Sequence, residues 1–283
     1  VLAGPHVGMF FAELGAEVIK IEHPEHPDVT RSWKLPTENP ESPVSAYFSS
    51  INYKKTYIQL NLQKAEDNIE ARQLISEADI LLVNFKKGDD VKFKLTDKEL
   101  LKLNPKLIIG KINGFGKNSD RVAYDLILQA ESGFMSMNGT SESGPIKMPV
   151  ALIDVLAAHQ LKEGILLALI HRLKTEKGKV VSVSLYDAAV SSLVNQASNY
   201  LMNKHIPQRI GSLHPNIAPY GELFKTADGK LITFAIGSQT HFEKLVLELD
   251  LKELLTDSRF INNQSRVENR KALAEVLQTK ITS

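Results

Sequence analysis

Short β-rich runs alternate with helix-like segments along most of this 283-residue chain. The strand-like runs are Val18 to Ile21, Thr56 to Leu62, Asp79 to Val83 and Lys106 to Ile112. Alternation with short connections is typical of a parallel, doubly wound sheet. The sequence therefore predicts an α/β fold, in which ligands bind beyond the carboxyl ends of the strands.

The opening stretch reads as half of a nucleotide-binding unit with an altered phosphate loop. A helix-like segment, Pro5 to Leu14, precedes a strand that ends on Glu22. In dinucleotide-binding folds an acidic residue at such a strand end holds a ribose, and a G-x-G-x-x-G turn cradles the pyrophosphate. Here the turn reads AGPHVG, which lacks the Gly-x-Gly spacing, and Pro5 offers no amide to a phosphate. We therefore expect no NAD.

Composition narrows the class of protein. Hydrophobic residues at 43% and charged residues at 24% are ordinary for a globular protein, and the net charge of +1 provides no long-range field for nucleic acid or membrane. The absence of cysteine excludes disulfides, cysteine-ligated zinc and thiol nucleophiles. Charge or histidine interrupts each apolar stretch within about 12 residues, too short for a bilayer. With no signal peptide visible, we expect a cytoplasmic protein.

The pattern of the sequence changes near His205. From there a loop leads into strands joined by an Asp228-Gly229 turn, which is typical of an antiparallel hairpin. We predict a large domain over residues 1–203 and a smaller α+β domain over 204–283. Val1 reads as the end of a strand whose beginning is missing, and the last helix has no closing element after it. We therefore expect this sequence to be a fragment of a longer protein.

Three longer helices are predicted in the second half of the large domain. Leu126 to Met135 and Ala188 to Met202 each read as one helix. The stretch from Asp154 to Gly178 is apolar almost all round, which favours a central, mostly buried helix.

Asp154 stands between two apolar residues at the head of that helix. Aspartate is a favoured N-cap, because its side chain accepts hydrogen bonds from the first free amides. A carboxylate at this position is also expected to stay ionised, because the helix dipole stabilises its charge. Such a group serves nucleophilic attack on an activated acyl carbon. The residues alone leave both interpretations open.

Other candidates are less specific. His23 and His26 flank a Pro-Glu pair and point either to a metal or to a structured loop. Lys87, Lys92 and Lys94 follow a strand end, where a phosphate site and a solvated turn are both reasonable. Gly-x-Ser-x-Gly is absent, which removes the nucleophile elbow of an α/β-hydrolase.

Several stretches, in order, resemble the family III CoA-transferases, the CaiB/BaiF group that includes formyl-CoA transferase, carnitine CoA-transferase and α-methylacyl-CoA racemase. They are AGPHVGMFFAELGAEVIKIEHP, Arg31-Ser32-Trp33, YFSSINYKKTYIQLNL, ADILLVNFKKG, LNPKLIIGKINGFG, YDLILQAESGFMSMNG, Asp154 with its helix, GKVVSVSLYDA and HPNIAPYGELF.

The resemblance implies a Rossmann-like large domain, a small domain and a homodimer of interlocked chains. It identifies Asp154 as the catalytic nucleophile that moves coenzyme A from an acyl-CoA to a carboxylic acid. The intermediates would be an aspartyl anhydride and an aspartyl-CoA thioester. Neither a metal nor a redox cofactor is required.

The resemblance also implies contacts to coenzyme A. Leu2 and Ala3 fall in the part of the pocket near the first turn, and Asn84 and Phe85 match a pair along the CoA groove. His23 replaces an arginine of some members. Lys87 occupies a position where proline is common. Lys92 or Lys94 matches a basic residue near the phosphates, and the alignment of this turn leaves both open.

Two alternatives accompany the transferase. A racemase of the same family needs an acid/base pair and uses a histidine before an aspartate, whereas this chain has Tyr124 before Asp125. Tyrosine ordinarily titrates near about 10 and histidine near about 6.5, so tyrosine is the poorer base. A CoA-binding protein without turnover is the alternative from another class. The acyl donor and acceptor stay open.

Overall fold

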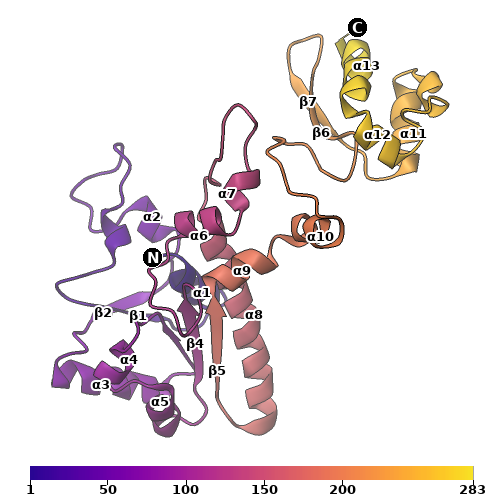
Figure 1. The fold of residues 1–283 in the computed structure, drawn as a ribbon. Coiled ribbons are helices and arrows are strands. Elements are labelled where there is room, and N and C mark those ends of the chain that lie inside the picture. The colour runs from indigo at the N-terminus through magenta and orange to yellow at the C-terminus, as the bar shows by residue number, and fades with distance from the viewer. Residues whose placement is uncertain (283) are drawn as a thin grey trace. The chain divides into compact units, whose positions relative to one another are not determined.

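The computed structural model describes residues 1–282 and confirms a mixed α/β architecture with parallel strands (Figure 1). The strands are β1 (Ile19–Glu22), β2 (Thr56–Gln59), β3 (Ile80–Val83), β4 (Ile108–Asn113), β5 (Lys179–Ser184), β6 (Tyr220–Lys225) and β7 (Leu231–Ala235). The helices are α1 (Ala3–Glu13), η1 (Val29–Ser32), α2 (Ala46–Ser49), α3 (Ala65–Glu77), α4 (Asp89–Lys92), α5 (Asp97–Leu103), α6 (Asp125–Glu131), α7 (Phe134–Met137), α8 (Leu152–Thr175), α9 (Leu185–Ser191), α10 (Val194–Asn203), α11 (Gln239–Glu248), η2 (Lys252–Leu255), α12 (Asn263–Glu268) and α13 (Arg270–Thr282).

The chain forms two compact units. The first comprises Val1–Met135 and Lys147–Ile206, and the second comprises Ser136–Ile146 and Pro207–Ser283. The chain therefore leaves the first unit and returns to it between α6 and α8. The predicted division into domains 1–203 and 204–283 stays a prediction.

The first unit contains two parallel sheets. One has the strand order β3-β4-β5, and the other pairs β1 with β2. Ile80 aligns with Ile108, and Ile108 aligns with Lys179, so the three strands of the larger sheet begin in register. Their carboxyl ends consequently lie at one edge, which is the edge where parallel sheets bind ligands.

Helices cover both faces of the larger sheet because apolar side chains alternate along β4. Ile108 and Ile112 are buried in a core with α1, α8 and α9. Their neighbours Leu107 and Ile109 are buried on the opposite face, in a core with α3 and α5. A strand buried on both faces is expected in a doubly wound sheet.

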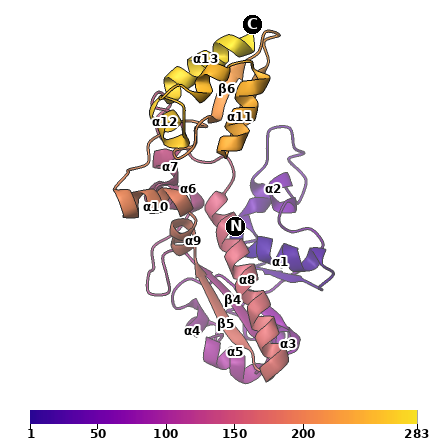
Figure 2. The same ribbon diagram turned by 90° about the vertical axis from the view of Figure 1, so that its right-hand side faces the viewer.

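The long helix α8 lies close against β4 and β5, with α1 beside it (Figure 2). Gly164 permits this approach, because a Cβ atom there would lie 2.5 Å from Val181 Cγ1 of β5. Figure 1 shows α8 running antiparallel to β5, so its first residues lie at the carboxyl edge of the sheet.

Two predicted single helices are each divided in the structure. The stretch from Leu126 to Met135 is split into α6 and α7, with Gly133 between them at a φ of 92°. The stretch from Ala188 to Met202 is split into α9 and α10. Between these helices the chain turns at Ser192 and Leu193, and Val194 has a φ of 46°, a left-handed backbone conformation that a continuous helix does not contain.

The helix α8 is less buried than its composition predicted. Ile153, Leu161 and Ile165 are buried against the sheet. In contrast, Leu167 is 68% exposed and Leu173 is 80% exposed, because α8 is an outer layer with one face against the strands. The prediction of a mostly buried helix was wrong for this face.

The long loop after β1 is organised around an ion pair. The Arg31 guanidinium donates from Nε and Nη2 to the two carboxylate oxygens of Glu22, at 2.9 and 3.0 Å. The same guanidinium lies 3.9 Å from the centre of the Phe48 ring. Glu22 is the residue in the ribose-binding position of a dinucleotide fold. Both of its carboxylate oxygens accept hydrogen bonds from Arg31, so it is not available to bind a ribose.

The second unit contains the predicted hairpin. β6 pairs antiparallel with β7, and the turn between them has Gly229 at a φ of 82°. Phe224, Phe242 and Phe260 are buried in its core. The buried Arg266 guanidinium donates to the carbonyl oxygens of Ala218 and Phe260.

Candidate active site

Asp154 is the third residue of α8 and is not its N-cap. Ala151 holds the N-cap position and provides no side-chain hydrogen bond. Instead, Asp125 of α6 caps the helix: its Oδ1 accepts from the amides of Ile153 at 2.7 Å and Asp154 at 3.3 Å. These are the amides that an N-cap side chain normally satisfies. The capping interpretation of Asp154 was wrong, because a distant aspartate performs that task.

A buried glutamine holds Asp125 in place. Gln129, one turn further along α6, donates from Nε2 to Asp125 Oδ2 at 2.6 Å. Its Oε1 accepts from the amide of Met148 at 2.8 Å, and the Gln129 side chain is fully buried. Both ends of the amide are therefore used, and the segment that leads into α8 is fixed to α6.

The Asp154 carboxylate is half-buried and free of hydrogen bonds within residues 1–282. Burial, and secondarily the charge of Asp125, raises the pKa of Asp154 from 3.8 to about 6, against a smaller lowering by the Val1 amino group. Desolvation thus outweighs the expected stabilisation of the charge by the helix. At pH 7 a group with this pKa is about nine-tenths ionised, so it retains unoccupied lone pairs and raised basicity.

The first residues of the chain lie at this end of α8. Leu2 is the N-cap of α1, and Ala3 is buried in the same core cluster as Ile153. The effect of the Val1 amino group on Asp154 also indicates proximity. The structure therefore brings Leu2 and Ala3 to the neighbourhood of Asp154.

An aromatic pair near Asp154 was not found from the sequence. The rings of Trp33 and Tyr47 meet edge to face, with centroids 5.1 Å apart. Burial, and then the charges of Asp154 and Asp125, raises the pKa of Tyr47. The matched stretch YFSSINYKK contains Tyr47, but nothing in its spacing indicates proximity to residue 154.

The second group of predicted residues follows β3. Asn84 and Lys87 are exposed, whereas Phe85 packs against Phe93 with ring centroids 5.7 Å apart. Lys92 and Lys94 are both exposed, and Lys92 Nζ lies 5.5 Å from the centre of the Phe93 ring. The structure therefore gathers the predicted asparagine, phenylalanine and lysines on one turn beyond a strand end.

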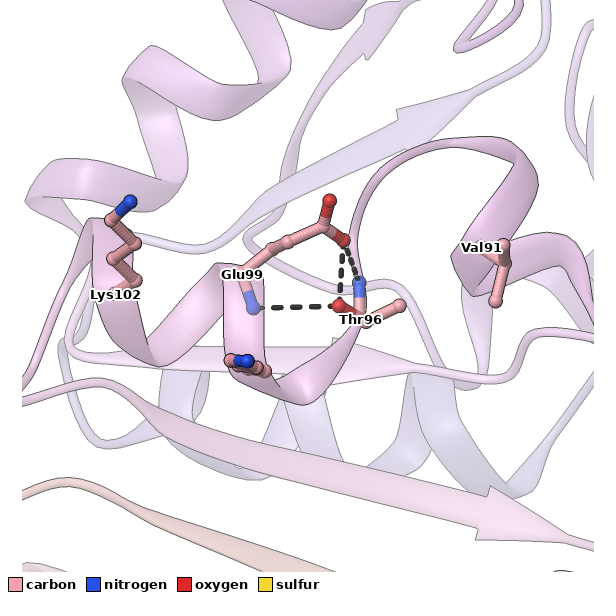
Figure 3. A pocket seen from close by; sticks show the side chains of 5 residues that line it. Val91, Thr96, Glu99 and Lys102 are labelled. Atoms are coloured by element: carbon pink, nitrogen blue, oxygen red, sulfur yellow. Dashed lines mark hydrogen bonds between the residues drawn. The ribbon is translucent and has the colours of Figure 1, made fainter.

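A shallow depression borders this turn on the outer side of α5 (Figure 3). The lining residues are Val91, Thr96, Lys98, Glu99 and Lys102. Thr96 and Glu99 form a capping box, in which Glu99 Oε2 accepts from the Thr96 amide at 3.0 Å and its hydroxyl at 2.6 Å. These two polar side chains of the depression therefore serve the start of α5.

The described contacts of His23 are with its own loop. Its ring stacks on that of His26 with centroids 5.0 Å apart, and its Nδ1 accepts from the amide of Glu25 at 3.1 Å. The part of the chain that the structure describes contains no group of three metal-binding side chains. The structured-loop interpretation of the histidine pair is thereby favoured.

The family model described as CoA-transferase family III matches residues 1–283. The chain belongs to CoA-transferase family III. The predicted family is thereby confirmed.

Named relatives and a solved structure agree with this family. The chain is 37% identical to the succinate–glutarate CoA-transferase of Agrobacterium fabrum, covering 99% of this chain and 71% of that protein. It is 34% identical to the mouse succinyl-CoA:glutarate CoA-transferase, covering 99% of this chain and 64% of that protein. A CaiB/BaiF family protein from Brucella suis has a TM-score of 0.81 and 37% identity, over 100% of this chain and 75% of that chain.

Among the residues of this chain that the structure describes, no helix is both long and apolar enough to cross a bilayer. The predicted cytoplasmic location and interlocked homodimer stay predictions.

Proposed function

We propose that the protein transfers coenzyme A from an acyl-CoA thioester to a free carboxylic acid, with Asp154 as the nucleophile. The observation that carries this proposal is the Asp154 carboxylate itself. It stands at a helix N-terminus without hydrogen bonds within the described residues, because Asp125 has taken over the cap. An ionised, partly desolvated carboxylate is suited to attack on an acyl carbon.

The proposed reaction conserves thioester energy in balanced steps. An Asp154 oxygen attacks the thioester carbon, the C–S bond breaks, and CoA leaves as a thiolate with a mixed anhydride on the enzyme. The thiolate attacks the aspartyl carbonyl, releases the donor carboxylate and forms an aspartyl-CoA thioester. The acceptor carboxylate then repeats these steps in reverse and restores Asp154. Exclusion of water protects the anhydride.

Short dicarboxylates are the proposed substrates. Relatives at 37% and 34% identity are named for succinate or succinyl-CoA and glutarate. We propose succinyl-CoA as donor and glutarate as acceptor for the first assays. The proposed CoA contacts are Leu2, Ala3, His23, Asn84, Phe85, Lys87, Lys92 and Lys94, and we further propose a homodimer.

Covalent trapping tests the nucleophile. After incubation with succinyl-CoA, hydroxylamine should convert Asp154 alone to a hydroxamate, detected by peptide mass mapping. A parallel reaction with a chiral 2-methylacyl-CoA is run in heavy water, because a 2-methylacyl-CoA racemase would exchange the α-hydrogen of that substrate at the rate of turnover. Transfer without a label on Asp154 would contradict the proposal. Deuterium exchange that keeps pace with turnover would favour the racemase, and CoA binding with neither reaction would favour a binding protein.

Replacing Lys87, Lys92 and Lys94 together with alanine should weaken CoA binding about tenfold at low salt and flatten its salt dependence. Exposed charge pairs contribute up to about 1 kcal/mol each and are screened by ions. Isothermal titration calorimetry measures the dissociation constant. The matched control replaces Lys244, Lys252 and Lys271, exposed lysines of the second unit. Equal affinities of the two variants would show that the turn is merely solvated.

A further inference from the structure

We propose that Asp125 is the positioning residue of Asp154: by capping α8 from outside, it leaves the Asp154 carboxylate unbound and fixes its place in the site. This inference rests on the proposed transferase function. The two residues lie on different helices, and Asp125 touches Asp154 through the backbone amide, at 3.3 Å.

The geometry separates two tasks that one aspartate at a helix start would otherwise combine. A carboxylate that caps its own helix has oxygens engaged by amides, which lowers its basicity. In this chain the amides of Ile153 and Asp154 bond to Asp125 Oδ1, at 2.7 and 3.3 Å. Asp154 consequently keeps its lone pairs for an electrophile.

Gln129 makes the capping carboxylate rigid. Its Nε2 holds the second oxygen of Asp125 at 2.6 Å, while its Oε1 receives the Met148 amide at 2.8 Å. The buried amide thus connects the cap to the segment that enters α8. Reactive groups need such support, because a small displacement of a reacting atom lowers the rate strongly.

Asp125 also affects Asp154 through its charge. The ionisable groups on helices packed against α8 include Asp125 and Glu131 of α6, His6 and Glu13 of α1, and Tyr186 and Asp187 of α9. After burial, Asp125 is the charge that raises the pKa of Asp154, and the Val1 amino group opposes it. Tyr47 of α2 faces the same pair, since both carboxylates raise its pKa.

Two variants in the intact protein separate position from charge. Asp125→Asn keeps an oxygen for the two amides and removes the charge, so the acid limb of the kcat profile should move to lower pH by about one unit. It also loses the bond from Gln129 Nε2, because the asparagine amide nitrogen that replaces Asp125 Oδ2 is itself a donor. Gln129→Met removes the support and keeps the charge. It should lower kcat by as much as about 100-fold, with the acid limb and the KM for succinyl-CoA unchanged.

The matched control is Asp187→Asn, which replaces an exposed aspartate at the third position of α9. It should change neither the acid limb of the kcat profile nor kcat itself. The pH dependence of thermal stability supplies a second readout that needs no turnover. If the wild type fails to transfer CoA, the proposed function fails, yet the stability titration of Asp154 must still shift in Asp125→Asn. An unshifted titration in that variant, with wild-type kcat in Gln129→Met, would overturn the positioning role.

Discussion

Asp154→Asn is expected to abolish CoA transfer and, above about pH 6, to raise the free energy of unfolding by as much as ~3 kcal/mol. The catalytic loss follows because an amide cannot form the aspartyl anhydride. The gain in stability follows from the pKa of Asp154, which burial and then Asp125 raise from 3.8 to about 6. A buried ionised carboxylate weakens the native state, and asparagine carries no charge.

The sign of the pH dependence is fixed by the same shift. Below about pH 4 the Asp154 side chain is protonated in both the native and the unfolded chain, so charge gives no difference between the proteins. Between about pH 4 and 6 the unfolded chain has lost this proton while the native wild type still holds it, so the wild type loses stability as the pH rises; once the native group has ionised, above about pH 6, the loss is complete. The advantage of Asp154→Asn therefore grows between these values and then levels off.

Urea unfolding followed by circular dichroism from pH 4 to 8 measures this difference. The control is Asp187→Asn, which removes a charge from the same helical position on an exposed surface and should leave the pH dependence unaltered. The assignment of Asp154 as a desolvated nucleophile would be contradicted by either of two results. In one, Asp154→Asn still transfers CoA; in the other, it is no more stable than wild type at pH 8.

Arg31→Ala is expected to lower the free energy of unfolding by about 3–5 kcal/mol, because it leaves the Glu22 charge buried without its main partner. The side chains of Arg31 and Glu22 are only 14% and 4% exposed. Lys20 Nζ, 3.8 Å from Glu22, compensates weakly. The variant should also lower transfer, because Arg31 organises the loop whose Trp33 contacts Tyr47 near Asp154.

A double-mutant cycle separates the ion pair from packing. Glu22→Gln/Arg31→Met replaces both charges and should recover much of the loss, since buried pairs are often no more stabilising than apolar groups of similar volume. Arg259→Ala is the exposed comparison, because its pair with Asp257 lies at the surface and should cost no more than about 1 kcal/mol. A cost for Arg31→Ala as small as that of Arg259→Ala would be incompatible with a clamp around Glu22.

Local patterns predicted the elements well where a single helix or strand carries its own signals. The predicted strands Asp79 to Val83 and Lys106 to Ile112 correspond to β3 and β4, and their ends differ from the observed ones by at most two residues. Boundaries failed at Gly133 and Ser192. Gly133 has a φ of 92°, and Val194, just after Ser192, has a φ of 46°, so left-handed backbone conformations interrupt sequences whose composition permits a continuous helix.

The arrangement of the site was less accessible to the sequence. Asp154 was identified by its place before an apolar helix and by the family resemblance. Its cap was not, because Asp125 lies 29 positions earlier and the contact depends on how α6 packs against α8. The sequence likewise predicted an ionised carboxylate from the helix dipole alone, since burial and a neighbouring charge are properties of the folded chain.

The chain leaves the first unit after Met135 and re-enters it at Lys147. The hydrogen bond between Gln129 and Met148 holds the two ends of this segment together, and it does not depend on the residues between them. Lengthening a loop whose ends are already fixed costs only about 0.6 kcal/mol for each doubling. A change in the length of segment 136–146 is therefore expected to leave the bond between Gln129 and Met148 in place, and with it the support of Asp125.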